Sequence, residues 1–139
     1  MLEPLGPQHN EPDYDAWSTS IEHIRGTPGF VDWSWPHAMT LDENLADLEM
    51  HALDFSERRG FTYTVLERST GEVIGCVYIY PASSRDVGRS CDSTEHDASV
   101  RSWVTASHAH LDRSLWLAVS DWLREGWPFE RVAYAARTG

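Results

Sequence analysis

The sequence predicts an α/β domain in which helices flank a mixed, mostly antiparallel sheet. After a short strand or coil, two segments carry apolar residues at the three- and four-residue spacing of helices. A hairpin of strand-forming residues follows, and the last third has the pattern of strand, helix and strand. The chain has 139 residues, 41% of them hydrophobic, which fits one compact domain over residues 1–139.

The first half of the chain predicts two helices joined by an aromatic loop. Residues 11–25 form the first helix, and residues 26–37, rich in glycine, proline and tryptophan, form the loop. A capping box of Thr40 and Glu43 begins the second helix, which ends before Gly60. The apolar stripes are Tyr14, Trp17, Ile21 and Ile24, and then Leu41, Leu45, Leu48, Ala52 and Phe55.

Strand-forming residues dominate the centre of the chain. Residues 61–67 and 72–80 are rich in β-branched and aromatic side chains and are separated by a turn at 69–71. This pattern predicts an antiparallel hairpin, and the polar residues 81–96 predict a loop.

The last third predicts a parallel strand–helix–strand unit. Residues 100–104 form its first strand and residues 131–136 its last. The helix between them ends near Gly126. Its apolar face consists of Leu115, Val119, Trp122 and Leu123.

Charge and composition exclude several classes of function. The chain has 22 acidic and 11 basic residues, a net charge of −11, which disfavours binding to the phosphates of nucleic acid. Residues 1–60 carry 12 acids and 3 arginines, whereas 61–139 carry 10 and 8, so an anionic ligand should prefer the second half. No apolar stretch is long enough to cross a membrane. The 2 cysteines predict free thiols and a cytoplasmic protein.

The order of elements resembles the GCN5-related N-acetyltransferase family over nearly the whole chain. The hairpin Gly71-Glu-Val-Ile-Gly-Cys-Val-Tyr-Ile-Tyr-Pro81 is followed by Ser102-Trp-Val-Thr105, by a helix ending in Asp121-Trp122-Leu123, and by Glu130-Arg-Val-Ala-Tyr134. The resemblance implies transfer of an acetyl group from acetyl-CoA to a primary amine of a small molecule or peptide. The alternative is a catalytically inactive relative that serves as a ligand-binding or protein-interaction module.

The resemblance also implies where acetyl-CoA binds. The backbone of Trp103, Val104 and Thr105 would contact the pantetheine arm in a gap between the fourth and last strands, with the Val104 N–H as oxyanion donor. The start of the following helix would hold the pyrophosphate. The expected ligands there are His110, Arg113 and Ser114.

One feature of this phosphate loop departs from the family pattern. The family's Gln or Arg, Gly, and Gly or Ala positions fall on Ala109, Asp112 and Ser114, and none of them matches. We expect Asp112 to cap the helix with its own carboxylate and to repel a phosphate.

Acetyl transfer needs a base for the amine and an acid for the thiolate. The family's usual base position falls on Ser99, so Glu95, His96 and Asp97 are the nearest candidates; otherwise they are loop residues. Tyr134 is the only tyrosine after the hairpin and is the candidate acid, although packing on the sheet explains it equally well.

Aromatic residues indicate the acceptor site. Trp33 and Trp35 precede the capped helix, in the loop that forms the acceptor site in the family, and Tyr80 ends the hairpin. Such walls favour an apolar or aromatic amine, and the acidic first half favours a cation. The alternative is that both tryptophans fill the gap between helix and sheet. The pair His108 and His110 lacks a second ligand pair, so we predict no metal site.

The family's C-terminal helix and last two strands have no counterpart before Gly139. The strand over 131–136 would then be an open sheet edge, and we expect a second copy of the chain to cover it in a homodimer.

Overall fold

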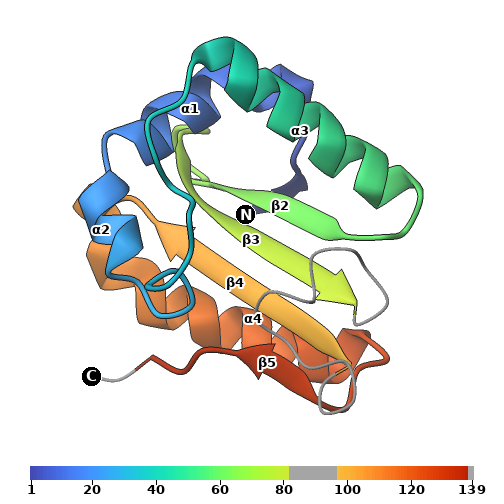
Figure 1. The fold of residues 1–139 in the computed structure, drawn as a ribbon. Coiled ribbons are helices and arrows are strands. Elements are labelled where there is room, and N and C mark those ends of the chain that lie inside the picture. The colour runs from blue at the N-terminus through green and yellow to red at the C-terminus, as the bar shows by residue number, and fades with distance from the viewer. Residues whose placement is uncertain (82–96, 138–139) are drawn as a thin grey trace.

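The computed structural model describes residues 1–81 and 97–137, which form a five-stranded sheet with helices on both faces (Figure 1). The strand order is β1-β2-β3-β4-β5. The first four strands pair antiparallel, and β5 pairs parallel to β4. The predicted mixed, mostly antiparallel sheet is therefore confirmed. The strands are β1 (Leu2–Pro4), β2 (Phe61–Leu66), β3 (Val73–Pro81), β4 (Ala98–Val104) and β5 (Val132–Tyr134).

The helices divide between the two faces of the sheet. Those from the first half of the chain pack with Cys76 and Trp103 on one face. The helix between β4 and β5 packs with Val77 and Val100 on the other. The helices are α1 (Asn10–Ser18), α2 (Ile21–Arg25), α3 (Leu41–Ser56) and α4 (Asp112–Gly126), with 3-10 turns η1 (Pro7–His9) and η3 (Ala106–Leu111). None of the helices in the described residues is both long and apolar enough to cross a membrane.

The single helix predicted over 11–25 is wrong, because α1 and α2 are separate. The Ser20 N–H donates to the Trp17 carbonyl at 3.0 Å, and the Thr19 hydroxyl donates to the Asp15 carbonyl at 2.9 Å. Short hydroxyl side chains offer the backbone such alternative partners and interrupt helices. Trp17 and Ile24 are nevertheless both buried in the same core cluster, as their spacing predicts.

The capping box of α3 is confirmed. The Thr40 hydroxyl accepts from the Glu43 N–H at 3.1 Å, and the Glu43 carboxylate accepts from the Thr40 N–H at 2.8 Å. The predicted apolar stripe is only partly buried, since Leu41 is 37% exposed. Polar residues, above all Asn44 and Asp54, share the buried face of α3 with Leu48.

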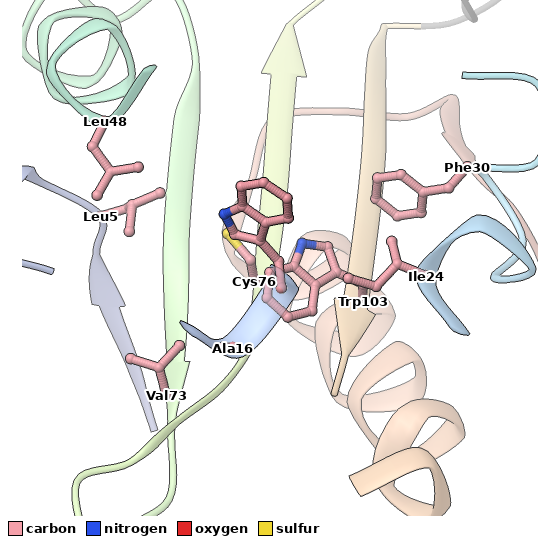
Figure 2. Close-up of a cluster of buried hydrophobic side chains, with 9 residues drawn as sticks. Leu5, Ala16, Ile24, Phe30, Leu48, Val73, Cys76 and Trp103 are labelled. Carbon is pink, nitrogen blue, oxygen red and sulfur yellow. The ribbon is translucent and has the colours of Figure 1, made fainter. Parts of the chain in front are cut away.

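Close contact between β3 and β4 fixes the centre of the sheet. Cys76 of β3 pairs with Trp103 of β4, and both side chains are fully buried beneath the helices (Figure 2). A Cβ atom on Gly75 would lie 2.4 Å from the Trp103 carbonyl oxygen. Only glycine therefore allows this approach.

The last strand is shorter than the predicted 131–136. It pairs with β4 from Ala98↔Val132 to Val100↔Tyr134, so the parallel strand–helix–strand unit is confirmed. Along the described sheet β5 is an edge strand. The homodimer through this edge stays a prediction.

Candidate functional site

The strand β4 extends beyond its parallel partner. Pairing with β5 stops at Val100, and β4 continues to Val104. The Thr105 N–H donates to the Ile74 carbonyl of the hairpin, so the backbone groups of alternate residues, Ser102 and Val104, face the side that β5 has left. Here the resemblance predicts the pantetheine gap. Trp103, Val104 and Thr105 are all buried along it.

Arg137 occupies this side of β4. Its side chain donates to the Ser102 carbonyl at 2.8 Å, to the Ala135 carbonyl at 2.7 Å and to Asp112 Oδ2 at 2.7 Å. The residue is only 7% exposed. The guanidinium thus ties β4, the segment after β5 and the first turn of α4 together. The Ser102 carbonyl is therefore already bonded to Arg137 in this conformation.

Asp112 does not cap α4, and that expectation is wrong. The N-cap residue is Leu111, with no side-chain hydrogen bond, and Asp112 is the first helical residue. Its Oδ2 pairs with Arg137, and its Oδ1 is buried without a hydrogen-bond partner. The carboxylate therefore neutralises the charge of a buried guanidinium. Burial of its Oδ1 costs free energy, because no hydrogen bond replaces the contact with water.

The other predicted phosphate ligands surround this first turn. His110 lies in η3, and Arg113 and Ser114 lie in α4; all three are exposed. The His110 ring stacks on His108, whose Nδ1 lies 2.8 Å from the Thr105 hydroxyl. His110, Arg113 and Ser114 stay predicted ligands of a pyrophosphate.

Tyr134 lies beside the same edge of β4. Its hydroxyl is 2.5 Å from the Ser102 hydroxyl, and the Arg137 guanidinium lies 5.7 Å from the ring centroid. Burial, the largest cause, raises the pKa of Tyr134 to about 12. The phenol therefore stays protonated at neutral pH, but the raised pKa makes it a weaker proton donor than an ordinary tyrosine. Its role as the acid stays a prediction.

The two predicted carboxylate bases have different outcomes. Glu95 lies outside the described residues, as do His96 and the rest of the predicted loop from residue 82 to 96. The Asp97 carboxylate accepts from the Glu130 and Arg131 N–H groups at 2.9 and 3.0 Å and pairs with the Arg131 guanidinium at 2.9 Å. The bonds to Arg131 and Glu130 lower the pKa of Asp97 to about 2. Such a carboxylate is a weak base, and its contacts instead hold the chain entering β5.

A cavity of about 330 Å³ lies between the sheet and helices α1 and α3, on the face of the sheet opposite to α4. The predicted acceptor residues Trp33, Trp35 and Tyr80 all line it. The Tyr80 hydroxyl lies 2.9 Å from His51 Nδ1 and 3.3 Å from Asp54 Oδ2, so its polar atom is tied to α3. The tryptophans also pack on the core, since the Trp35 ring lies 6.1 Å from Trp103.

A second cavity adjoins the first over β4 and β5. The two share the walls formed by Trp33, Ser99 and Arg101, and the second also reaches Tyr134. The Arg101 guanidinium stacks 3.6 Å from the centroid of the Trp33 indole and donates to the Gly29 carbonyl at 2.9 Å. This stack therefore fixes the aromatic loop over β4.

The polar side of the first cavity was not among the residues predicted from the sequence. Asp13 of α1 and Asn44, Asp47 and His51 of α3 line it. The helical spacing of these residues in the sequence could have indicated them. Asp13 precedes Trp17 by one helical turn and so shares its buried face, and the α3 residues recur every three or four positions.

Asp13 is the most perturbed acid of this group. It is 4% exposed, and its Oδ2 accepts one hydrogen bond, from the Asn44 amide at 3.2 Å. Burial raises the pKa of Asp13 to about 6, against the opposing effects of Asn44 and His9. A carboxylate with this pKa in a cavity is a marker of a ligand site.

Within residues 1–81 and 97–137, no three His, Cys, Asp or Glu side chains gather as a metal site would need.

Comparison with known proteins identifies the fold. The ribosomal-protein-S5-alanine acetyltransferase of Vibrio fischeri superposes with a TM-score of 0.69 at 11% identity, over 96% of this chain and 68% of that chain. A probable acetyltransferase gives 0.66 at 13% identity, over 99% and 71%. A putative ribosomal-protein-serine acetyltransferase of Vibrio cholerae gives 0.61 at 14% identity, over 88% and 62%.

At this identity the similarity shows the fold alone. No protein-family model matches the sequence, and no curated protein matches it either. The chain thus has the fold of GCN5-related acetyltransferases, as the resemblance implied, and spans roughly two thirds of the length of these three structures.

Proposed function

We propose that this chain, with its acetyltransferase fold, transfers an acyl group from an acyl-CoA, foremost acetyl-CoA, to a primary amine of a small molecule or peptide. One observation carries the proposal. A cavity with aromatic walls and a buried carboxylate runs along the sheet to β4, the strand whose far edge would receive the thioester. Ligand sites combine apolar walls with a few polar groups in this way.

The reaction places clear demands on this edge. The amine nitrogen attacks the thioester carbonyl, a C–N bond forms, the C–S bond breaks, and the amine proton is lost while the thiolate gains one. The Val104 N–H faces this edge and can stabilise the oxyanion. Tyr134, protonated at neutral pH, can donate to the departing sulfur.

Arg137 must leave the Ser102 carbonyl before a pantetheine chain can enter. A pyrophosphate near the start of α4 offers this guanidinium a new anion in place of Asp112, and arginine pairs well with phosphate oxygens. The proposed function thus includes a change of partner for Arg137.

A second candidate function rests on the same contact. If the Arg137–Asp112 pair never opens, the gap stays filled and the protein is a catalytically inactive module that binds ligands in the aromatic cavity. The burial of Arg137 against β4 is the observation that supports this second function.

Calorimetry with CoA, acetyl-CoA and pantetheine separates the two. The enzyme predicts that CoA binds and that pantetheine, without the pyrophosphate, binds at least tenfold more weakly. It also predicts amine-dependent release of CoA thiol from acetyl-CoA. Absence of binding heat and of a thermal shift with millimolar CoA would leave only the inactive module.

A further inference from the structure

The acidic end of the first cavity has a composition that the proposed reaction does not explain. Asp13 and Asp47 line it together with Asn44 and Leu5. Asp13 is nearly fully buried, yet no cation pairs with it among the described residues. A buried carboxylate is costly unless a cation or several donors compensate it.

The surroundings of Asp13 supply little compensation. The Asn44 amide that donates to it also donates to Asn10 Oδ1 at 2.9 Å and to the Asn10 carbonyl at 3.4 Å, so three acceptors share its two N–H groups. His9 of η1 is the nearby basic group, but its Nε2 lies 2.8 Å from a Glu3 carboxylate oxygen. Asp47 adds a like charge, and Cys76 and Tyr78 of β3 add two weakly acidic groups. Among the residues that the structure describes, the carboxylate therefore lacks a strong partner.

The walls next to Asp13 suit an organic cation. The Trp35 ring centroid lies 5.9 Å from that of Phe30 and 6.2 Å from that of Tyr78, and all three residues line the cavity. Aromatic faces attract an ammonium group, and they bury the apolar body that carries it. A volume of about 330 Å³ lies at the small end of ligand cavities.

The two ends of this cavity differ in charge and position. Asp13 interacts with Cys76 and Tyr78 of β3. The other end is formed by Ser99 and Arg101 of β4, next to the edge where the acyl group would lie. The ends are thus about one to two strand spacings apart, of the order of 5–10 Å. An ammonium held at Asp13 is therefore not the nitrogen that reacts.

We propose that the acceptor is a small diamine with an aromatic or apolar spacer, whose non-reacting ammonium group binds Asp13, with Asp47 in support. This inference rests on the proposed acyl transfer and names its substrate class. The remote ammonium fixes one end of the acceptor, and the spacer directs its second, neutral amine along the aromatic walls toward β4.

The test uses two acetamides that differ only in the remote cation. N-[4-(aminomethyl)benzyl]acetamide has the proposed ammonium, and N-(4-ethylbenzyl)acetamide has a methyl group in its place. Binding to the full chain without any CoA is followed by tryptophan fluorescence and calorimetry. We expect the ammonium compound to bind at least tenfold more tightly to the wild-type chain.

Variants assign this preference to one carboxylate. Asp13→Asn should reduce the preference to less than twofold, and Asp47→Asn should reduce it by a smaller factor. Asp15→Asn, an exposed position on the same helix, should leave it unchanged. Thermal unfolding of each variant checks its fold. Equal binding of the two acetamides to the wild-type chain, or a preference retained in Asp13→Asn, would overturn the proposal.

The same measurements distinguish failure of the proposed acyl transfer from failure of the proposed cation site. An Asp13-dependent preference for the ammonium compound in a protein that binds no CoA would support the cation site and reject the enzyme. Binding of CoA with no ammonium preference would reject the cation site alone.

Discussion

Arg137 and Asp112 meet at the edge of β4 that β5 leaves unpaired. The pair is largely buried, and the guanidinium also holds the Ser102 carbonyl. A buried ion pair adds little net stability but makes the loss of one partner expensive. The contact is therefore suited to exchange of partners, in which an incoming anion replaces the carboxylate, rather than to simple loss of one of them.

The variant Asp112→Asn tests this exchange. It keeps the side-chain shape and removes the charge, so CoA affinity should rise at least tenfold because the phosphate no longer competes with a carboxylate for Arg137. Unfolding in urea should show a loss of about 3 kcal/mol, since a buried guanidinium loses its counter-ion.

Asp121→Asn is the matched control for this substitution. Asp121 lies on the same helix and pairs with Arg124 in an exposed ion pair, so its removal should cost less than about 0.5 kcal/mol and leave CoA affinity unchanged. Weaker CoA binding by Asp112→Asn would show that the carboxylate helps to hold the ligand.

At the scale of elements, the β3–β4 pair positions both halves of the candidate site. Tyr78 and Tyr80 of β3 form the floor of the aromatic cavity, and Ser99 and Arg101 of β4 form its far end. At Gly75 the two backbones leave no room for a Cβ atom, and this position lies beside the strand end that the acyl group would use.

Gly75→Ala should therefore disturb β4 directly. Its Cβ would meet the Trp103 carbonyl at 2.4 Å, and backbone atoms yield less readily than side chains. We expect a loss of about 2–3 kcal/mol in the free energy of unfolding, measured by urea denaturation.

Gly126→Ala serves as its control. There the new Cβ meets only the Trp122 ring, at 3.5 Å, so this variant should be neutral or gain up to about 1 kcal/mol, because glycine is a poor helix residue. Equal stabilities of the two variants would contradict the close approach.

At the scale of the whole molecule, two carboxylates give stability opposite dependences on pH. The pKa of Asp13 is raised in the fold, so its contribution is fully present below pH 3.8 and is lost as the pH rises through about 6. The pKa of Asp97 is lowered, so its contribution is present above pH 3.8 and is lost as the pH falls through about 2.

Denaturation of Asp13→Asn and wild-type chains between pH 4 and 7 measures the first effect. The shift from 3.8 to about 6 corresponds to at most about 3 kcal/mol, so the variant should gain stability relative to wild type by up to that amount across this interval. Asp15→Asn should follow the wild-type profile. Parallel profiles for Asp13→Asn and wild type would contradict the burial of an ionised carboxylate.

The sequence by itself determined the elements whose signals are local. The capping box of Thr40 and Glu43 begins α3, the turn at 69–71 joins β2 to β3, and the apolar face of 112–126 makes α4. Hydrophobic period and capping chemistry act between residues a few positions apart, so they can be recognised without knowledge of the fold. The resemblance carried by these elements then indicated the acetyltransferase fold.

Only the tertiary structure decided the contacts that define the site. Arg137 reaches Asp112 and Ser102 across 25 and 35 residues, and Asp97 caps the entry to β5 across 34. Asp13 carries a partial signal, its place on the buried face of α1. Its lack of a cationic partner among the described residues depends on what the folded chain brings near it. Electrostatic pairing and burial depend on distance in space, which local sequence patterns do not encode.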